Sequence, residues 1–310
     1  MQLIRIGTRE SKLALWQAKR IESLLNGRNI PTQIVAVKSE GDIDLVSPLY
    51  EMGVQGIFTR TLDAALLNNK IDVAVHSFKD VPVTLARGLQ VAAIPERGSW
   101  HDVMVTKNAS TVPFIYQPFT LATSSMRRKA QWLNRYPAHS IEPLRGNINT
   151  RLTKLKETAH WSAALFAAAG IERIGLEVPH KTHLDWMLPA PAQGAIVVVS
   201  HEDNVKIKEL CLSFHDADAE MCTTVERSFL HTLQGGCSMP VGAHAQIVDD
   251  KILFRGNILS IDGKAKAEVN FECPQHEYGE AGNKAAEILL SKGGDKIITG
   301  LKAYQVTNGN

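Results

Sequence analysis

Residues 72–82 read DVAVHSFKDVP, and this stretch decides the fold. Asp72 to His76 is an apolar run of strand length, and the Val81-Pro82 step ends it. Segments typical of strands and helices alternate around it: strands at 3–6, 32–37 and 89–94, and helices after a Thr8 or Ser11 cap and at 58–69. Such alternation predicts a largely parallel sheet with helices on both faces.

The same alternation restarts after residues 96–98 (Glu-Arg-Gly), although no sequence repeat relates the two regions. The pattern predicts strands at 103–106, 119–123, 140–144, 163–167, 184–188 and 196–199, and helices at 125–136 and 147–157. We interpret residues 97–195 as a second α/β domain, and residues 1–96 together with 196–214 as the first.

In the last third, residues 215–310, the alternation of strand and helix stops. A helix is predicted at 217–233, and the segments 243–248, 251–259 and 264–271 alternate apolar and polar residues between short turns. This pattern predicts a small α+β domain with a three-stranded antiparallel sheet, one face in water and the other covered by a helix at 280–290.

Composition excludes several classes of protein. The 310 residues are 44% hydrophobic and 21% charged, with a net charge of +2, which argues against a disordered chain, a nucleic-acid partner or a polybasic membrane anchor. No apolar run approaches the ~20 residues of a membrane span, and no secretion signal is visible. The four cysteines have no CxxC spacing, which fits a reducing, cytoplasmic location without a zinc site. We expect no metal, and the absence of nucleotide-binding motifs predicts no nucleotide cofactor.

Positive charge is concentrated between residues 121 and 180, which hold nine Arg and Lys against four Glu. Arg127 and Arg128 follow the predicted capping segment Thr123-Ser124-Ser125 and lie in the first turn of the helix, where cations oppose the helix dipole at a cost of ~0.3–1 kcal/mol each. A bound anion would offset this cost. Arg145 and Arg151 repeat the arrangement around another strand end.

Arg9, which follows the first strand, is a third position of this kind. Several arginines on separate turns indicate a ligand with several carboxylates, bound between two α/β domains. The alternative, that these arginines pair with acidic side chains across the domain, stays open.

Asp80 and Cys237 are the reactive candidates. Asp80 follows a buried strand beside Lys79, where a carboxylate can stabilise a positive charge or move protons, or can simply cap the next turn. Cys237 lies in the loop GGCSMP, which suits a nucleophile or an attachment point as well as a small buried residue. We read the other three cysteines and His76 as structural.

Many motifs along the chain match one family. They include GTRESKLALWQ (7–17), GIFTRTLDAALL (56–67), DVAVHSFKDVP (72–82), ATSSMRRKAQ (122–131), LRGNINTRLTKL (144–155), AAAGIERIGLE (167–177), PAPAQGA (189–195) and GGCSMPVGAHA (235–245). With these motifs in this order, the chain resembles the porphobilinogen deaminases, also called hydroxymethylbilane synthases.

The resemblance implies two domains like type II periplasmic binding proteins around a cleft, and a third domain carrying Cys237. It also implies a transferase with a dipyrromethane cofactor joined to Cys237 by a thioether. Such an enzyme condenses four porphobilinogen molecules onto this primer with loss of ammonia, and hydrolysis then releases linear hydroxymethylbilane for porphyrin and heme biosynthesis. A monomer that hands its product to uroporphyrinogen-III synthase is expected.

The resemblance also implies roles for single residues. Asp80 would stabilise the azafulvene cation that forms when porphobilinogen loses ammonia, and Phe58 with the loop before it would cover the cleft. The residues expected to bind the cofactor and substrate are Arg9, Ser11, Lys79, Thr123, Ser125, Arg127, Arg128, Arg145, Gly146, Arg151, Arg173 and Gln193.

The chain departs from the family pattern at several positions. Gln55 replaces Lys, Ser99-Trp100-His101-Asp102 replaces Asp-Pro-Arg-Asp, and Ser162, Ala192 and Ser200 replace Asp, Gly and Glu. Two other functions stay open: a carboxylate-binding protein without chemistry, and an inactive homologue that keeps the cofactor. The GGC loop and the third domain favour the enzyme, because a plain receptor needs neither.

Overall fold

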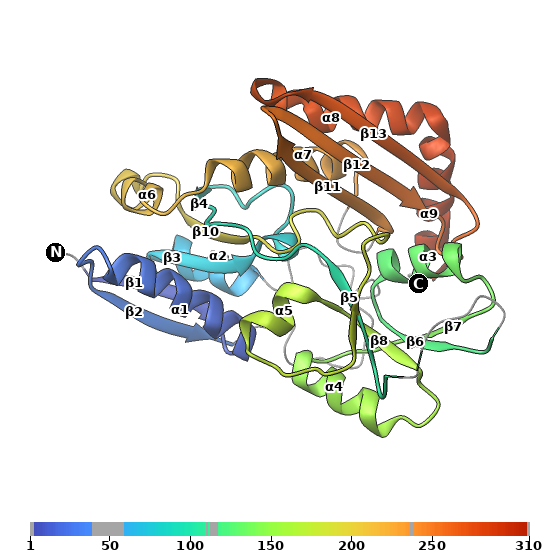
Figure 1. Ribbon diagram of the computed structural model, residues 1–310. Coiled ribbons are helices and arrows are strands. Elements are labelled where there is room, and N and C mark those ends of the chain that lie inside the picture. Colours follow the sequence, from blue (N-terminus) through green and yellow to red (C-terminus); the bar gives the residue numbers. More distant parts are fainter. Residues whose placement is uncertain (1–2, 39–58, 110, 112–116, 236–238, 309–310) are drawn as a thin grey trace.

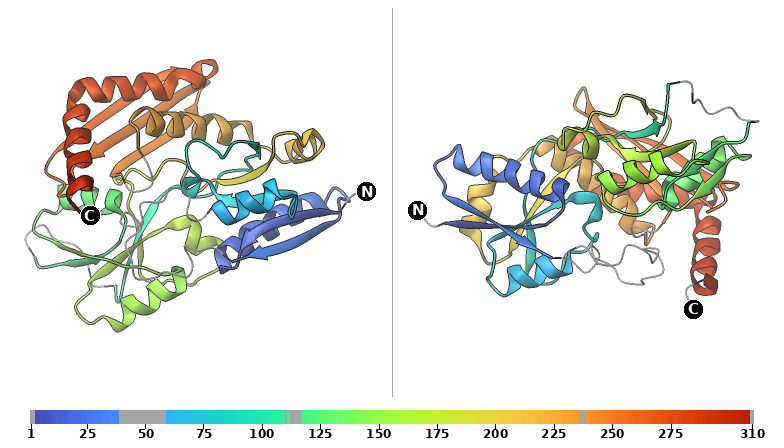
Figure 2. Two further views of the ribbon diagram at one scale, coloured as in Figure 1. Left: turned by 180° about the vertical axis from the view of Figure 1, so that it is seen from behind. Right: turned by 90° about the horizontal axis from the view of Figure 1, so that it is seen from below.

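The computed structural model describes residues 3–38, 59–109, 111, 117–235 and 239–308. Within these residues the chain forms three separate sheets (Figure 1). Two five-stranded sheets lie side by side, and a three-stranded sheet packs beyond them with its own helices, as the views from behind and below also show (Figure 2).

The first sheet has the strand order β2-β1-β3-β10-β4. Its strands are β1 (Ile4–Arg9), β2 (Thr32–Val37), β3 (Val73–Ser77), β4 (Leu89–Ala93) and β10 (Ile196–His201). Only β10 runs antiparallel to its neighbours, which confirms a largely parallel sheet. Helices α1 (Lys12–Asn26) and α6 (Val205–Leu212) bury one face, and α2 (Arg60–Leu67) buries the other.

The second sheet repeats this arrangement with the order β7-β6-β8-β5-β9. Its strands are β5 (Asp102–Thr106), β6 (Thr120–Ala122), β7 (Ser140–Glu142), β8 (Ala163–Ala167) and β9 (Lys181–His183), and its helices are α3 (Met126–Arg135), α4 (Ile148–Glu157) and α5 (Ala168–Arg173). Four strands that are consecutive in the sequence, β1 to β4 in the first sheet and β6 to β9 in the second, lie in the same spatial order in both sheets: the second, first, third and fourth of each set. An antiparallel strand, β10 or β5, lies between the third and the fourth. The sheets therefore share a topological repeat that the sequence does not show.

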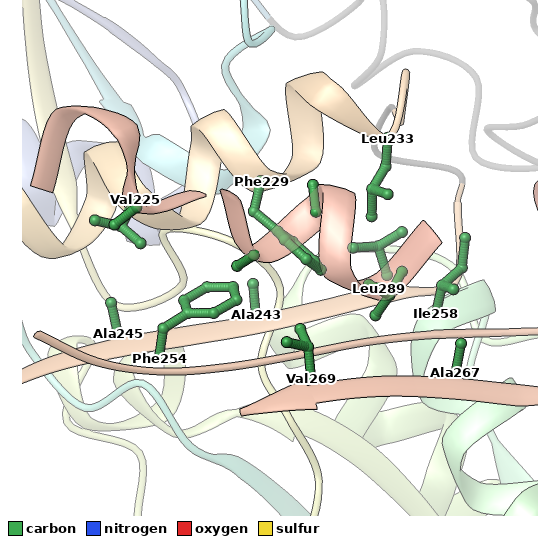
Figure 3. Packing of buried hydrophobic residues seen from close by; sticks show 14 of the residues in the cluster. Val225, Phe229, Leu233, Ala243, Ala245, Phe254, Ile258, Ala267, Val269 and Leu289 are labelled. Atoms are coloured by element: carbon green, nitrogen blue, oxygen red, sulfur yellow. The ribbon is translucent and has the colours of Figure 1, made fainter. Parts of the chain in front are cut away.

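The third sheet, β11 (Val241–Val248), β12 (Lys251–Leu259) and β13 (Lys266–Pro274), is antiparallel as predicted. Helices α7 (Ala217–Thr232) and α8 (Tyr278–Leu289) cover one face (Figure 3). There Phe229 of α7 packs on Phe254 of β12 with ring centroids 4.9 Å apart. Three short segments, η2 (Phe78–Asp80), η3 (Gln275–Glu277) and η4 (Leu290–Gly294), and the C-terminal α9 (Asp295–Asn308) complete the elements.

The strand predicted at 184–188 is wrong. The edge strand is β9, Lys181–His183, whose three residues are exposed, so it lacks the apolar alternation that would reveal it. Leu184 and Met187 are buried from a turn, closed by a hydrogen bond from the Met187 N–H to the Leu184 carbonyl, and their apolar character imitates a strand. Helices α5, α6 and α9 were not predicted.

Among the described residues, no helix is both long and apolar enough to cross a bilayer. The described residues also hold no cluster of three or more His, Cys, Asp or Glu side chains that could bind a metal ion.

Candidate active site

Lys79 and Asp80 lie in the short helical turn η2, which follows the carboxyl end of β3. The buried Phe78 anchors this turn, because its N–H donates to the Ala195 carbonyl at 3.0 Å. Lys79 Nζ donates to Gln193 Oε1 at 3.2 Å. The structure therefore confirms that Asp80 lies at a strand end beside a cation.

The Lys79 ammonium is in an unusual environment. Burial lowers its pKa to about 8, and the cations Arg128 and Arg127 act in the same direction, while Asp80 and Asp102 oppose the change. Lys79 can therefore exchange its proton near neutral pH.

The first arginine pair begins α3. Ser125 caps this helix by accepting from the Arg128 N–H at 3.4 Å, and Thr123 Oγ1 accepts from the Ser125 N–H at 3.2 Å. Arg127 and Arg128 are each only 5% exposed. They therefore lie inside the protein, at the carboxyl end of β6.

Asp102, the first residue of β5, pairs with both arginines. Arg127 Nη1 lies 2.5 Å from Asp102 Oδ2, and Arg128 Nη2 lies 2.7 Å from Oδ1. Gln193 Nε2 donates to Asp102 Oδ1 as well, at 3.0 Å. Burial alone would raise the pKa of Asp102, but the two guanidiniums hold it well below its usual range. The sequence left open whether these arginines pair with acidic side chains, and in the structure Arg127 and Arg128 do pair with Asp102.

The second arginine site begins α4. Gly146 has φ of 116°, and a Cβ there would lie 2.8 Å from the Thr150 side chain, so only glycine fits. Asn147 caps the helix by accepting from the Thr150 N–H at 3.0 Å, and Arg151 Nε donates to the Gly146 carbonyl at 2.7 Å. These contacts set the position of the Arg151 guanidinium.

Two further observations join the parts of the site. Ser124 Oγ accepts from the Leu144 N–H at 2.9 Å, which ties the loop before α3 to the loop before α4. Burial lowers the pKa of Arg151 to about 10, with Arg128 and Arg145 acting in the same direction and Asp80 opposing them. Charges from both sheets therefore act on one guanidinium, and the site spans the two sheets.

The site contains more positive than negative charge. Five cations and two carboxylates act on one another here, namely Lys79, Arg127, Arg128, Arg145, Arg151, Asp80 and Asp102. Arg127 and Arg128 are buried and paired with Asp102, while Lys79, Arg145 and Arg151 are partly buried. The group as a whole has three more positive than negative charges, which favours the binding of an anion. This donor set fits a ligand or cofactor that carries several carboxylates.

Arg9 ends β1, next to β3, and Ser11 caps α1 by accepting from the Ala14 N–H at 3.3 Å. His76 of β3 is buried as expected, but within the described part of the chain its Nε2 has no hydrogen-bond partner. Burial, followed by the charge of Arg9, lowers the pKa of His76 to about 4.

Arg173 lines a cavity of about 250 Å³ together with Trp16 and Arg20. Its Nη2 donates to the Gly194 carbonyl at 2.5 Å, and its guanidinium lies 5.6 Å from the Trp16 ring centroid. Cys237, Phe58 and Gln55 fall outside the described residues.

The other three cysteines, Cys211, Cys222 and Cys273, are buried and free, as predicted. Burial raises the pKa of Cys211 and of Cys222 to about 12, so neither is a ready nucleophile.

Two buried carboxylates, Asp102 in the site and Glu226 in α7, were missed by sequence reasoning. Asp102 was noted only within a departure from the family pattern, and Glu226 was not singled out. Glu226 lies on the buried face of α7 with Cys222, Val225 and Phe229, and a carboxylate at that helical spacing among apolar residues was the available signal.

Two of the departures have a visible local structure. Ser162 Oγ accepts from the Thr120 N–H at 3.2 Å, so the serine completes the contact between β6 and β8. Ala192 has φ of 60°, in the left-handed region that glycine adopts without strain, which explains why the family pattern has glycine there.

The fold and this site define a class: a protein of two linked α/β domains with a third α+β domain, in which cations gather between the first two sheets. The family model "Porphobilinogen deaminase, dipyromethane cofactor binding domain" matches residues 4–209, and "Porphobilinogen deaminase, C-terminal domain" matches residues 220–291. The chain belongs to the porphobilinogen deaminase family, whose members are enzymes of tetrapyrrole synthesis.

Curated relatives agree along nearly the whole chain. The porphobilinogen deaminase of Syntrophotalea carbinolica is 36% identical over 302 residues, covering 96% of each chain. That of Syntrophomonas wolfei is 37% identical over 302 residues, covering 96% of this chain and 98% of its own. Among solved structures, the methionine-binding protein MetQ is 12% identical with a TM-score of 0.43, covering 70% of this chain and 92% of MetQ.

Proposed function

We propose that this chain is a hydroxymethylbilane synthase, a transferase. It condenses four porphobilinogen molecules head to tail onto a dipyrromethane primer, releases ammonia, and then frees linear hydroxymethylbilane by hydrolysis. The observation that carries this proposal is the group of five cations and two carboxylates drawn from two sheets. Each pyrrole unit bears an acetate and a propionate, so a growing chain needs many cations to hold it.

The proposed cofactor is a dipyrromethane joined to Cys237 by a thioether, which supplies the primer to which substrate units are joined. The excess of guanidiniums fits a group with several carboxylates, because planar guanidiniums bind carboxylates through paired hydrogen bonds. The residues proposed to bind the carboxylates of cofactor and substrate are Arg9, Ser11, Lys79, Thr123, Ser125, Arg127, Arg128, Arg145, Gly146, Arg151, Arg173 and Gln193.

Asp80 is the proposed catalytic residue. When porphobilinogen loses ammonia, positive charge develops on its pyrrole nitrogen, and a nearby carboxylate lowers the energy of that cation. The same carboxylate can accept and return the pyrrole N–H proton. Lys79, beside it, keeps a proton that is easily exchanged near neutral pH.

The domain boundaries that we propose are 1–96 with 196–214, 97–195, and 215–310. Strand β5 lies in the second sheet, and strand β10, which follows the second sheet's strands in the sequence, lies in the first. This arrangement supports the division within the first 214 residues. We further propose that the protein acts as a monomer in the cytoplasm and passes its product to uroporphyrinogen-III synthase.

Incubation of the purified chain with porphobilinogen tests the function directly. We expect hydroxymethylbilane and four equivalents of ammonia per product molecule. Binding of porphobilinogen without any consumption, in a chain of unmodified mass, would instead identify a carboxylate-binding protein. A chain that carries the cofactor but makes no product would be an inactive homologue.

A further inference from the structure

Arg227, in helix α7, holds the turn that carries Lys79 and Asp80. Its Nη1 donates to the carbonyls of Val81 at 3.0 Å and Phe78 at 3.3 Å, and its Nη2 donates to the carbonyl of Pro82 at 2.6 Å. These three carbonyls lie on both sides of Asp80 in the sequence. The Arg227 guanidinium therefore forms hydrogen bonds to the backbone both before and after Asp80.

The Arg227 guanidinium also lies over the ring of Phe78, the first residue of the turn. Arg227 Cζ lies 4.2 Å from the centroid of the Phe78 ring, which is a cation–π distance. The buried Phe78 ring fixes one side of the turn, and the rigid fork of Arg227 fixes the carbonyl side. A lysine at this position could not make all of these contacts at once.

Helix α7 runs between the first and third sheets (Figure 1). Its residues Val225 and Phe229 belong to the hydrophobic core of the third sheet (Figure 3). The chain continues from its end toward Cys237 within a few residues. Arg227 thus connects the segment that leads to the proposed attachment point with the turn that presents Asp80.

We propose that Arg227 is a positioning residue for the reaction, which sets the place of the Asp80 carboxylate relative to the third domain. This proposal rests on the proposed function of Asp80. Without the guanidinium, the carbonyls of Phe78, Val81 and Pro82 lose their shared donor and the turn is free to shift. A displacement of about 1 Å in such a group can reduce a rate by about 100-fold.

The test compares Arg227→Met and Arg227→Lys with wild type, using the full chain with its cofactor. Arg28→Met is a matched control, because Arg28 also bridges two backbone carbonyls, those of Leu24 and Ser213, far from the turn. The measurements are the intact mass, kcat and KM for porphobilinogen, and amide hydrogen exchange across residues 77–83.

For Arg227→Met we expect an unchanged cofactor mass, a kcat lower by about 100-fold and a KM within about threefold of wild type. Exchange of the Phe78 and Val81 amides, which donate to Ala195 and Phe78, should rise by about tenfold. Arg227→Lys should have a kcat and an amide exchange rate between those of wild type and Arg227→Met. Arg28→Met should match wild type in kcat and in exchange across the turn.

Two results would overturn the proposal: unchanged exchange in Arg227→Met, or faster exchange with a wild-type kcat. The second result would make Arg227 a purely structural contact. If wild type makes no hydroxymethylbilane, the proposed function fails, while the exchange measurement still decides whether Arg227 holds the turn.

Discussion

The Glu226 carboxylate accepts two hydrogen bonds from the Arg97 guanidinium, at 2.8 and 3.0 Å. It also accepts from the backbone N–H of Ala192 at 2.6 Å and of Ala245 at 2.8 Å. Arg97 and Ala192 lie in the two segments that connect the first sheet with the second. One fully buried carboxylate therefore joins the third domain to both connections.

Replacing Glu226 by Gln should destabilise the whole protein. The change leaves the Arg97 guanidinium, whose side chain is 11% exposed, without its counter-charge, and breaking a buried pair in this way costs ~3–5 kcal/mol. Urea unfolding should show the loss. Glu220→Gln, on the same helix and with a 45% exposed side chain, is the control and should change stability by less than about 0.5 kcal/mol. Equal stability of the two variants would contradict this role of Glu226.

His76 should make the protein less stable as the pH falls. Its pKa is lowered to about 4 in the folded chain, from 6.5, so the unfolded chain takes up a proton first. Stability is therefore lost between pH 6.5 and about 4, with a slope of up to ~1.4 kcal/mol per pH unit for one proton. His76→Phe should flatten this slope in urea titrations, and the exposed His231, changed to Phe, should not. An unchanged slope in His76→Phe would exclude this proton linkage.

Lys79 should limit activity on the alkaline side. Its pKa of about 8 means that the ammonium, and with it one carboxylate-binding charge, disappears as the pH rises through that value. We expect kcat/KM to fall above pH 8 in wild type, and this fall to move to higher pH in Lys79→Arg, because arginine stays charged. If Lys79→Arg declines at the same pH as wild type, another group controls the alkaline limb.

Asp80→Asn should separate cofactor binding from turnover. The amide keeps the shape of the side chain but can neither balance a positive charge nor accept a proton as a carboxylate does. We expect the mass of the cofactor adduct to persist in whole or in part, and kcat to fall by ~10²–10⁴-fold. Product formation at the wild-type rate would remove Asp80 from the mechanism.

Strands and helix caps that depend only on residues close together in the sequence could be predicted from the pattern of those residues. The strands at 32–37, 163–167 and 251–259 were predicted with their observed bounds, because their apolar residues are continuous or alternate clearly. The cap of α3 within residues 123–125 was also visible, since a cap and its helix are adjacent. Edge strand β9 was missed because its residues are exposed.

Long-range pairings could not be predicted in the same way. Asp102 meets Arg127 across 25 residues, and Glu226 meets Arg97 across 129 residues. Nothing local to either carboxylate specifies its partner, because the packing of the sheets creates the contact. For the same reason the sequence could not decide whether Arg127 and Arg128 face a ligand or an internal acid.

The intact mass of the denatured protein, expressed in a host that makes porphobilinogen, tests the central claim most directly. If the cation-rich site serves a tethered pyrrole chain, the mass should exceed that of the 310 residues by two pyrrole units, and peptide mapping should locate the addition at Cys237. Cys237→Ser should carry no addition. An unmodified wild-type mass, or an addition on another residue, would contradict the account.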